Sequence, residues 1–542
     1  MSPRDSPGTG AVRRTALRVR TIAVDAAGGP ARARVALTLA AVLAVSGADT
    51  GTISAVADNL ERAFGVGNTQ IGLLLTVVSL TGAVCTVPAG ILTDRVRRTR
   101  LLGGSIVIWA VATVASGAAT SYLWLLLARV ALGVVTATAG PAIASLTGDF
   151  FPAADRARMY GLILGGELAG SGVGFLISGD LSSVTTWRAA FWWLAVPSLA
   201  LAWVVWRLPE PARDGASRIP AGATEVTDER DVAAGGAARV RARRRGKSSG
   251  QEEPAPVERA LADSGVGPRD DLVLREDPAR RSLWWAVGYV LRVRTNVVII
   301  VASALGYFYF AGLRSFAVIF ATGHYGISKP TASLLILVIG LGTLAGVYVG
   351  GRATDRLLRR GHLRVRVFLP AACLLAVTPV FAAGIAVPAV PIALPLLIVG
   401  GFLLGAPNPG LDAARLDIMP GRLWGRAEAV RTALRSAGEA TAPLLFGFVS
   451  QYVFGGPGAA SPGPASQGTG SPAAASGGTT AAQSAGLEYT FLLFLGALLI
   501  AGLFALAALR TYPRDVATAV ASDKAIGQAA AGPRDKAGSS AA

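Results

Sequence analysis

Long stretches of apolar residues, each about the length of a membrane-spanning helix, alternate with short polar segments along most of the chain. A helix that crosses the hydrocarbon core of a bilayer needs roughly 20 mostly apolar residues. Twelve segments meet this requirement: 35–57, 71–93, 101–119, 122–146, 159–181, 187–208, 296–320, 331–353, 365–387, 391–416, 431–454 and 488–510. The pattern therefore predicts an all-α membrane protein with twelve transmembrane helices.

The order of these segments divides the chain into two halves with six predicted helices each. The linker between the halves contains a run of arginines and almost no large apolar residues. Such a segment cannot bury enough apolar surface to fold, which predicts disorder. The expected organisation is a cytoplasmic tail at 1–34, a six-helix bundle at 35–208, a disordered linker at 209–285, a second six-helix bundle at 286–512 and a cytoplasmic tail at 513–542.

Two segments of the second half differ from simple spanning helices. Residues 455–486 consist mainly of Gly, Ala, Ser and Pro and carry no charge, which predicts a flexible external loop. Residues 280–293 mix Trp284, Trp285 and Leu291 with arginines. This composition is typical of a helix that lies in the membrane interface, so we expect such a helix just before the seventh spanning segment.

The basic residues occupy the loops on one side of the predicted membrane domain. A net charge of +18 often indicates a nucleic-acid partner. Only 15% of the residues are charged, however, against about 25% in soluble proteins, and arginines gather after even-numbered helices and in both tails. Such an excess marks the cytoplasmic side. We therefore expect a multi-pass plasma-membrane protein with both termini and the linker in the cytoplasm, and no nucleic-acid partner.

Residues that build metal sites or catalytic centres are scarce. The two cysteines, Cys85 and Cys373, lie inside apolar runs, and the chain has only two histidines. A disulfide framework or a Cys-based metal site is not expected from this usage. Neither a nucleophile–base pair nor a Walker A sequence is evident. We expect no cofactor, no metal and no enzymatic activity.

A short pattern occurs twice, once in each half. Residues 90–95 (GILTDR) end the second predicted helix, and residues 351–356 (GRATDR) end the second helix of the second half. Two helices further on, residues 151–152 (FP) and 419–420 (MP) are each followed by arginines. Two halves that repeat in parallel are typical of transporters with a midplane binding site between the halves.

These motifs resemble the major facilitator superfamily. Residues 90–98 (Gly-x-Leu-x-Asp-Arg-x-x-Arg) are similar to the family's loop motif between helices two and three. Arg129-x-x-x-Gly133 is similar to its fourth-helix motif, and the glycines along 161–179 are similar to its fifth-helix antiporter motif. The resemblance implies two six-helix bundles around a central cavity, and proton-coupled export of a substrate.

Within the superfamily, three stretches resemble the spinster-like branch, which includes lysolipid and sphingolipid carriers. They are residues 170–175, 408–427 and 438–440. Asp49 falls where this branch has an acid in the first helix, whereas Thr136 replaces a glutamate of the fourth helix. This resemblance implies a lipid or lysolipid substrate as an alternative.

Several charged residues fall inside predicted spanning helices, and four of them are the main candidates for mechanism. Charged groups in lipid cost several kcal/mol unless they face a cavity or a partner, so each is a functional hypothesis. Asp49 and Arg129 lie at similar depth in helices that line one cavity in the superfamily fold, which makes them candidates for an ion pair that couples transport to protons, with a fixed structural ion pair as the alternative. Glu167 is a second candidate for proton coupling, with interhelical packing as the alternative. Arg314 is expected to face the cavity, with snorkelling to the outer surface as the alternative.

Aromatic residues on the seventh helix are further cavity candidates. Tyr307 and Phe310 suit an apolar or amphipathic substrate by packing or cation–π contact. The alternative is that they face lipid. Thr136, at the position of the replaced glutamate, completes the predicted cavity.

The repeated pattern is expected to gate the cytoplasmic side. A carboxylate beside the N-terminus of a neighbouring helix is favoured by the helix dipole, so two such contacts would stabilise one access state. Charges near the tenth and eleventh helices are expected to join this gate or to form a structural network. The predicted gating residues are Asp94, Arg95, Arg98, Asp355, Arg356, Asp417 and Glu439.

The sequence therefore predicts a secondary active transporter that works by alternating access, coupled to protons and exporting a small amphipathic organic compound. A spinster-like lysolipid or lipid carrier is the second hypothesis. A membrane sensor or scaffold that acts through the basic linker is the third. The expected partners are a small-molecule or lipid substrate, protons and membrane lipid, and the expected oligomeric state is a monomer.

Overall fold

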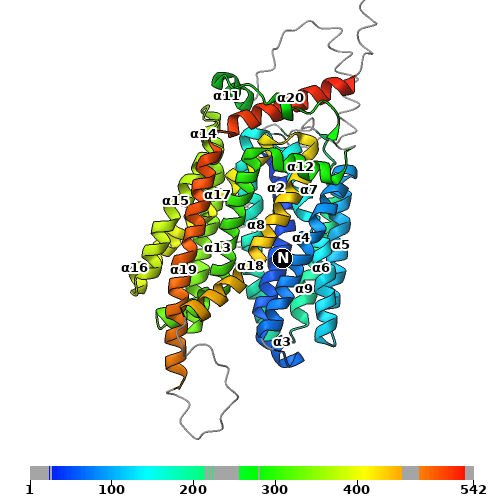
Figure 1. Cartoon of the computed structure of the whole chain (residues 1–542). Coiled ribbons are helices and arrows are strands. Elements are labelled where there is room, and N and C mark those ends of the chain that lie inside the picture. The colour runs from blue at the N-terminus through cyan, green and yellow to red at the C-terminus, as the bar shows by residue number, and fades with distance from the viewer. Residues whose placement is uncertain are drawn as a thin grey trace, which may run out of the picture.

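The computed structural model describes residues 24, 27–66, 68–213, 219, 223, 256–278, 281–454 and 475–531. This part of the chain is helical apart from turns and short connections. Eleven of its helices are long and apolar enough to cross a membrane. A further long helix, α18, runs alongside them but carries several charged residues (Figure 1). The predicted all-α fold with twelve spanning helices is confirmed.

The first half forms one bundle, coloured blue to green-cyan in Figure 1. The short helix α3 (Ala57–Phe64) lies at one end of it. The spanning elements are α2 (Pro30–Ala55), α4 (Asn68–Arg95), α5 (Arg98–Gly117), α6 and α7 (Tyr122–Thr136 and Ala139–Phe150), α8 (Arg156–Val184) and α9 (Ala189–Trp206).

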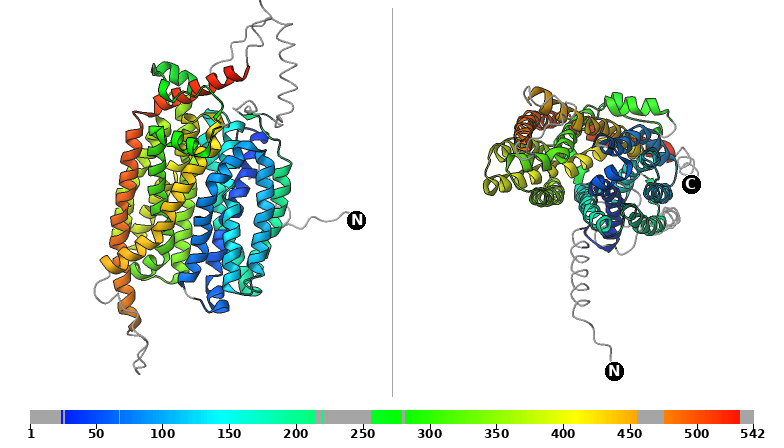
Figure 2. Two further views of the ribbon diagram at one scale, coloured as in Figure 1. Left: turned by 45° about the vertical axis from the view of Figure 1, so that its right-hand side comes forward. Right: turned by 90° about the horizontal axis from the view of Figure 1, so that it is seen from below.

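The second half forms a second bundle beside the first, as both views in Figure 2 show. Its spanning elements are α13 (Arg294–His324), α14 (Lys329–Arg359), α15 (Val365–Ala386), α16 and α17 (Val390–Gly405 and Pro407–Ile418), α18 (Trp424–Phe448) and α19 (Ala475–Ala508).

The fourth helix of each half is interrupted at an equivalent place. In the first half, α6 ends at Thr136, whose hydroxyl donates to the carbonyl of Gly133 at 3.1 Å, and α7 begins two residues beyond Ala137. In the second half, α16 gives way to α17 at Ala406, just before Pro407, which has no backbone N–H to donate. The expected continuous helices at 122–146 and 391–416 are therefore each built from two segments, and the internal repeat extends to this break.

Three short helices lie together at one end of the two bundles, which we call the linker face (Figure 1). They are α11 (Pro256–Ser264), α12 (Leu283–Arg292) and α20 (Tyr512–Ala531). Helix α20 buries Val516 and Ala517, and the carboxylate of Asp515 accepts a hydrogen bond of 3.0 Å from the backbone N–H of Thr295 near the start of α13.

These helices correct two expectations. The predicted tail at 513–542 is helical as far as Ala531, because its apolar positions pack onto the second bundle. The predicted disorder of the linker at 209–285 is wrong for 256–278, where Val257 and Ala260 on α11 join the same buried cluster. The remaining linker residues other than 209–213, 219, 223 and 281–285 lie outside the described residues, as do 1–23 of the N-terminal tail.

Two further boundaries differ from the prediction. Helix α19 begins at Ala475, so the second part of the expected external loop at 455–486 is helical, and 455–474 lie outside the described residues. Helix α18 begins at Trp424 rather than at 431 and continues into a π-helical turn at Val449–Val453. The sequence predicted a later start because the first turns of α18 contain charged residues, which interrupt the apolar pattern.

Small residues let helices α2 and α8 of the first bundle pack closely together. A Cβ atom added at Gly170 would lie less than 3.0 Å from backbone atoms of Ala44, and one at Gly174 would meet Ala48 in the same way. Gly172, on another side of α8, has no atom within 4 Å of that position. The glycine pattern of the fifth spanning helix therefore permits direct backbone contact with the first.

Candidate functional site

A central cavity lies between the two bundles. It encloses about 980 Å³, part of which is open to solvent. Helices α2 and α8 line it from the first bundle, and α13 to α17 line it from the second. Most of the wall is apolar, with side chains that include Leu164, Leu168, Val347, Leu374, Leu404 and Leu411.

Two charged side chains line the central cavity, one from each bundle. Glu167 extends from α8, and Arg314 extends from α13. Arg314 is 3.8 Å from the carboxylate of Glu439 on α18. Among the described residues, none makes a hydrogen bond or ion pair with the side chain of Glu167. The sequence assigns Glu439 to the gate, but its contact with Arg314 places it beside the central cavity.

Two aromatic residues of α13 also line the cavity, as the sequence predicts. They are Tyr307 and Phe310. The guanidinium of Arg435, from α18, lies 4.2 Å from the centre of the Tyr307 ring. Tyr307 lines the cavity, whereas Arg435 does not. Arg435 therefore contacts the cavity wall through the ring of Tyr307.

Thr136 does not line the central cavity. It borders a smaller hollow of about 390 Å³ inside the first bundle, together with Ser46, Trp109 and Thr138. The structure therefore places Thr136 at a hollow lined by α2, α5, α6, α7 and α9 of the first bundle and not in the wall of the central cavity.

Asp49 and Arg129 form an ion pair inside the first bundle. One guanidinium nitrogen of Arg129 lies 2.7 and 2.8 Å from the two carboxylate oxygens of Asp49. The side chains are only 8% and 1% exposed, and Phe191 covers the guanidinium at 4.9 Å. The predicted pairing is present, but neither residue lines the central cavity.

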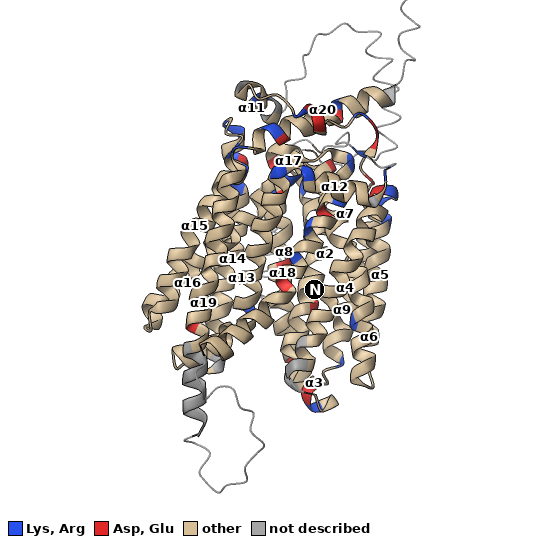
Figure 3. Ribbon diagram, in the orientation of Figure 1, with Lys and Arg blue, Asp and Glu red and all other residues tan. Residues whose placement is uncertain are grey.

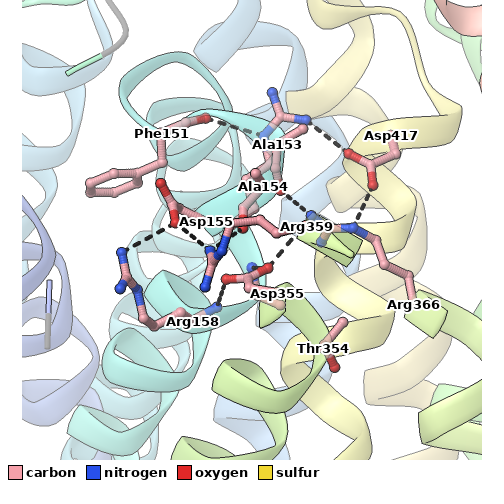
Figure 4. Close-up of polar contacts among 12 residues, drawn as sticks. Phe151, Ala153, Ala154, Asp155, Arg158, Thr354, Asp355, Arg359, Arg366 and Asp417 are labelled. Atoms are coloured by element: carbon pink, nitrogen blue, oxygen red, sulfur yellow. Dashed lines mark hydrogen bonds and ion pairs between the residues drawn. The ribbon is translucent and has the colours of Figure 1, made fainter. Parts of the chain in front are cut away.

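Two carboxylates join the bundles at the linker face. Asp94, at the end of α4, lies 3.1 Å from Nε of Arg426 and accepts a hydrogen bond from the backbone of the first turn of α18; we call this the Asp94 latch. Asp355, at the end of α14, accepts hydrogen bonds from the backbone N–H groups of Ala157 at 3.2 Å and Arg158 at 2.7 Å, in the first turn of α8; this is the Asp355 latch (Figure 4). A carboxylate of each bundle therefore caps a helix of the other.

Asp417 connects further elements at the same face. Its carboxylate lies 3.1 Å from Arg156 of α8 and 2.8 Å from Arg366 of α15 (Figure 4). The hydroxyl of Tyr512, at the start of α20, donates to it at 3.1 Å. Burial raises the pKa of Tyr512 well above its ordinary value, so the hydroxyl keeps its proton for this bond. Asp417 thus links both bundles and α20.

Three arginines predicted for the gate do not bridge the bundles. Arg95 and Arg356 are exposed, and neither has an ion pair within the described part of the chain. Arg98 is buried inside the first bundle, where it pairs with Asp149 and with Glu210. In the repeated pattern the carboxylates therefore make the interbundle contacts, because their helix ends face the partner bundle while the following arginines point away.

Glu210 is an anchor that the sequence analysis placed in a disordered segment. Its carboxylate accepts hydrogen bonds from the backbone and side chain of Thr99 at 2.9 and 2.7 Å and pairs with Arg98 at 2.9 Å. Burial alone would raise the pKa of Glu210, but the Arg98 guanidinium and the bonds from Thr99 outweigh it and hold the pKa below its ordinary value. Residues just after α9 are thereby tied to the start of α5.

A second charged network lies between the cavity and the linker face. Arg431 lies 2.9 Å from Asp412 and 3.1 Å from Glu428, and Arg415 pairs with Glu428. Asp412 and Arg415 belong to the charges near the tenth helix that the sequence predicts for a gate or a structural network, whereas Glu428 and Arg431 were not predicted to take part. Their signal was the heptad-like spacing of charges along α18, where Glu428, Arg431, Arg435 and Glu439 recur every three or four residues.

The two bundles are in close contact at the linker face. A Cβ atom at Gly148 would lie less than 3.0 Å from the ring of Trp424, and one at Gly351 would lie less than 3.0 Å from the backbone of Ala157. Most basic residues of the described part of the chain also gather at this face, whereas few charges lie along the middle of the helices (Figure 3). The structure is therefore closed at the linker face, and its central cavity retains solvent contact.

The sequence matches a model of the family described as Major Facilitator Superfamily over residues 39–377. The "Probable L-galactonate transporter" of Escherichia coli (strain K12) is 27% identical over 154 residues, which are 28% of this chain and 34% of that protein. "Protein spinster homolog 1" of Mus musculus is 30% identical over 138 residues, which are 25% of this chain and 26% of that protein. The matches thus span about a third or less of these curated relatives.

Two solved structures share the fold at low sequence identity. A bacterial homolog to the human lysosomal transporter spinster, described as inward-facing and occupied, has a TM-score of 0.53 and 20% identity, and the match covers 90% of this chain and 98% of that one. The human organic anion transporter MFSD10 has a TM-score of 0.55 and 16% identity, with 87% and 98% covered.

Proposed function

The chain belongs to the Major Facilitator Superfamily, and from this premise we propose that it exports a small amphipathic organic compound in exchange for protons. Transport as such follows from the family. The observation that carries the finer proposal is the central cavity, whose wall is mainly apolar and which presents the carboxylate of Glu167 without an ion-pair partner among the described residues.

Alternating access is supported by the asymmetry between the two ends of the cavity. The Asp94 and Asp355 latches hold the bundles together at the linker face. The arginines at this face mark it as cytoplasmic by the positive-inside rule, so the closed face is the cytoplasmic one and the cavity is accessible from outside. We propose that both latches open when the cavity turns toward the cytoplasm, and that the protein resides in the plasma membrane.

Proton coupling is assigned to two places. Glu167 lies at the cavity wall, where protons from solvent reach it. Asp49 and Arg129 lie deeper, and protonation of Asp49 would release a buried guanidinium whose other nitrogens have no hydrogen-bond partner among the described residues. A change in this pair would act on the contact of α2 with α8, which also carries Glu167. The alternative, a permanent structural ion pair, predicts that Asp49→Asn keeps the wild-type dependence of transport on pH.

A spinster-like lysolipid or lipid carrier is the second candidate. It is supported by curated relatives named spinster. Thr136, which replaces an acid of that branch, favours movement of the lipid without proton coupling. The sensor or scaffold hypothesis depends on the basic linker, whose arginine run lies outside the described residues. The monomeric state also stays a prediction.

The experiment is a flux measurement in proteoliposomes that contain the full chain. A panel of lipophilic cations, lysolipids and sugar acids is loaded, and efflux is followed with and without an imposed pH gradient. We expect the pH gradient to accelerate the efflux of one amphipathic compound, with uptake of protons in exchange. A protonophore that collapses the gradient should abolish this acceleration. Flux that ignores the gradient contradicts proton coupling, and lysolipid movement under those conditions supports the second candidate.

A further inference from the structure

Helix α12 packs one face onto the second bundle and leaves the opposite face uncovered. It lies against α13 and α18 at the linker face, at the outer edge of the bundles (Figure 1 and Figure 2). Ala286, Tyr289 and Val290 are buried in the apolar cluster beneath it. On the other face, Trp284 is 80% exposed and Leu291 is 44% exposed. Residues seven positions apart share one side of a helix, so these two side chains form a single apolar stripe.

The apolar stripe of α12 ends beside two arginines without partners. Arg292 and Arg294 are exposed, and neither makes a hydrogen bond or ion pair within the described part of the chain. Arg281, at the other end of the helix, is already compensated, because it lies 2.7 Å from the carboxylate of Glu276. This surface therefore combines exposed apolar side chains with an uncompensated positive charge.

The position of α12 identifies the bilayer as what covers this surface. Only Val293 separates α12 from α13, which has the length and hydropathy of a membrane-spanning helix. The uncovered face thus lies where the hydrocarbon core gives way to the headgroups. Tryptophan is enriched at that depth, and a basic amphipathic helix binds more strongly to a bilayer that contains anionic lipid. In the membrane interface, the apolar stripe is also removed from water.

One guanidinium joins the residues that lead into α12 to the Asp94 latch. Nε of Arg426, on α18, lies 3.1 Å from the carboxylate of Asp94. Nη1 of the same Arg426 donates to the carbonyl of Pro278 at 3.0 Å and to that of Arg281 at 3.5 Å. If α12 is held at the membrane surface, these two carbonyls stay beside Arg426, and the guanidinium stays directed at Asp94.

We propose that α12 docks on anionic phospholipid of the cytoplasmic leaflet and thereby stabilises the closed linker face. Trp284 and Leu291 enter the interface, while Arg292 and Arg294 bind headgroup phosphates. The attraction acts only within about a Debye length of an anionic surface, so it weakens in a bilayer of neutral lipid and at high salt. Release of α12 loosens the carbonyls that hold Arg426, and the latch then opens more easily. This adds control by lipid charge to the transport cycle.

The first test measures whether α12 lies in the bilayer. A spin label is attached at Gly288→Cys, on the exposed face, in nanodiscs of phosphatidylglycerol and phosphatidylcholine in equal parts, with Cys85 and Cys373 replaced by serine. No atom lies within 4 Å of the Cβ position of Gly288, so the label does not disturb the packing. Gly267→Cys, also exposed and without neighbours, is the matched control in the linker. The label at 288 should respond more to oxygen than to a water-soluble nickel chelate, and the label at 267 should show the reverse order.

The second test removes the charge that the lipid would bind. Spin labels at the exposed positions Arg100 and Arg360, one in each half, report opening of the linker face by double electron–electron resonance. Arg292→Gln combined with Arg294→Gln should raise the ratio of open to closed molecules about tenfold in the anionic nanodiscs. The labelled chain without these two substitutions should show a similar rise when the nanodiscs contain phosphatidylcholine alone.

Two controls separate α12 from other charges and the lipid from a free anion. Arg356→Gln combined with Arg364→Gln removes the same charge from other exposed positions of the second bundle and should leave the ratio unchanged. Inorganic phosphate added to phosphatidylcholine nanodiscs should not restore closure, because the free ion does not hold the apolar stripe.

Four results overturn the proposal. They are a label at 288 that responds like the label at 267, an open fraction that ignores lipid charge, an equal response of the control variant, and closure by free phosphate. None of these readouts uses a substrate or a pH gradient. Lipid-dependent closure without proton-driven efflux would therefore reject the proposed function alone, whereas proton-driven efflux with a lipid-independent linker face would reject this inference alone.

Discussion

The carboxylate of Asp355 in the second bundle accepts a hydrogen bond of 2.7 Å from the backbone N–H of Arg158 in the first. The same relationship, with the bundles exchanged, joins Asp94 to the first turn of α18 at Arg426. Both carboxylates come from the repeated Thr-Asp-Arg pattern. The internal repeat of the sequence is thus also the symmetry by which the linker face closes.

Weakening the Asp355 latch should open the linker face. Asp355→Asn keeps the side-chain volume but removes the charge from bonds that are worth about 1.5–3 kcal/mol when one partner is ionised. The population open at this face should rise about tenfold or more. Spin labels are placed at the exposed positions Arg100 and Arg360, one in each half. Double electron–electron resonance should show a longer distance between the two labels in Asp355→Asn than in the wild type.

The matched control is Arg356→Gln, which alters the next residue of the pattern. Arg356 is exposed and has no ion pair in the described part of the chain, so the label distances should not change. Both native cysteines, Cys85 and Cys373, are replaced by serine in all samples so that only the labels react. A closed linker face in Asp355→Asn would show that the latch does not hold this state.

The contact between α2 and α8 should not tolerate a methyl group. Gly170→Ala places a Cβ atom against the backbone of Ala44, and we expect the unfolding free energy to fall by about 1–3 kcal/mol or more, because the backbones must move apart. Gly172→Ala is the control on the same helix, since no atom lies within 4 Å of its Cβ position. Thermal melting in detergent distinguishes them, and equal melting temperatures would contradict the packing argument.

Features that depend on local pattern were predictable from the sequence. The apolar runs give the spanning helices, and the repeat gives the positions of Asp94 and Asp355, because a helix end and its charge recur at the same place in each half. The similar depth of Asp49 and Arg129 also made them candidates for a pair, since unpaired charges are costly in lipid. Their burial away from the cavity was not predictable, because it depends on which side of α2 faces α6.

Features that depend on contacts distant in sequence were not predictable. Tyr512 reaches Asp417, and Ser522 accepts a hydrogen bond of 3.0 Å from the backbone N–H of Leu274, only because α20 folds back over the linker face. Composition placed Leu274 in the predicted linker and Ser522 in the predicted tail, with no sign that the two segments meet. Glu210 was missed for the same reason, since its partner Arg98 lies more than one hundred positions earlier.

The anchor at Glu210 should make stability depend on pH in acid. Its pKa in the folded protein lies below the ordinary value of 4.5, so its contribution is fully present above pH 4.5 and is lost as the pH falls through the lower folded pKa. Glu210→Gln should melt at a lower temperature than the wild type at pH 7, and the gap should narrow below pH 4.5. A gap that stays constant to pH 3 would contradict this assignment.

Replacing the buried acid of the first bundle should affect both stability and coupling. Asp49→Asn leaves the guanidinium of Arg129 buried without its counterion, and breaking such a pair costs about 3–5 kcal/mol. Asp180→Asn, at an exposed position of α8, is the control and should melt like the wild type. In proteoliposomes, efflux by the folded fraction of Asp49→Asn should no longer respond to an imposed pH gradient. If the variant is destabilised but keeps the wild-type pH profile, the pair is structural and proton coupling rests on Glu167 alone.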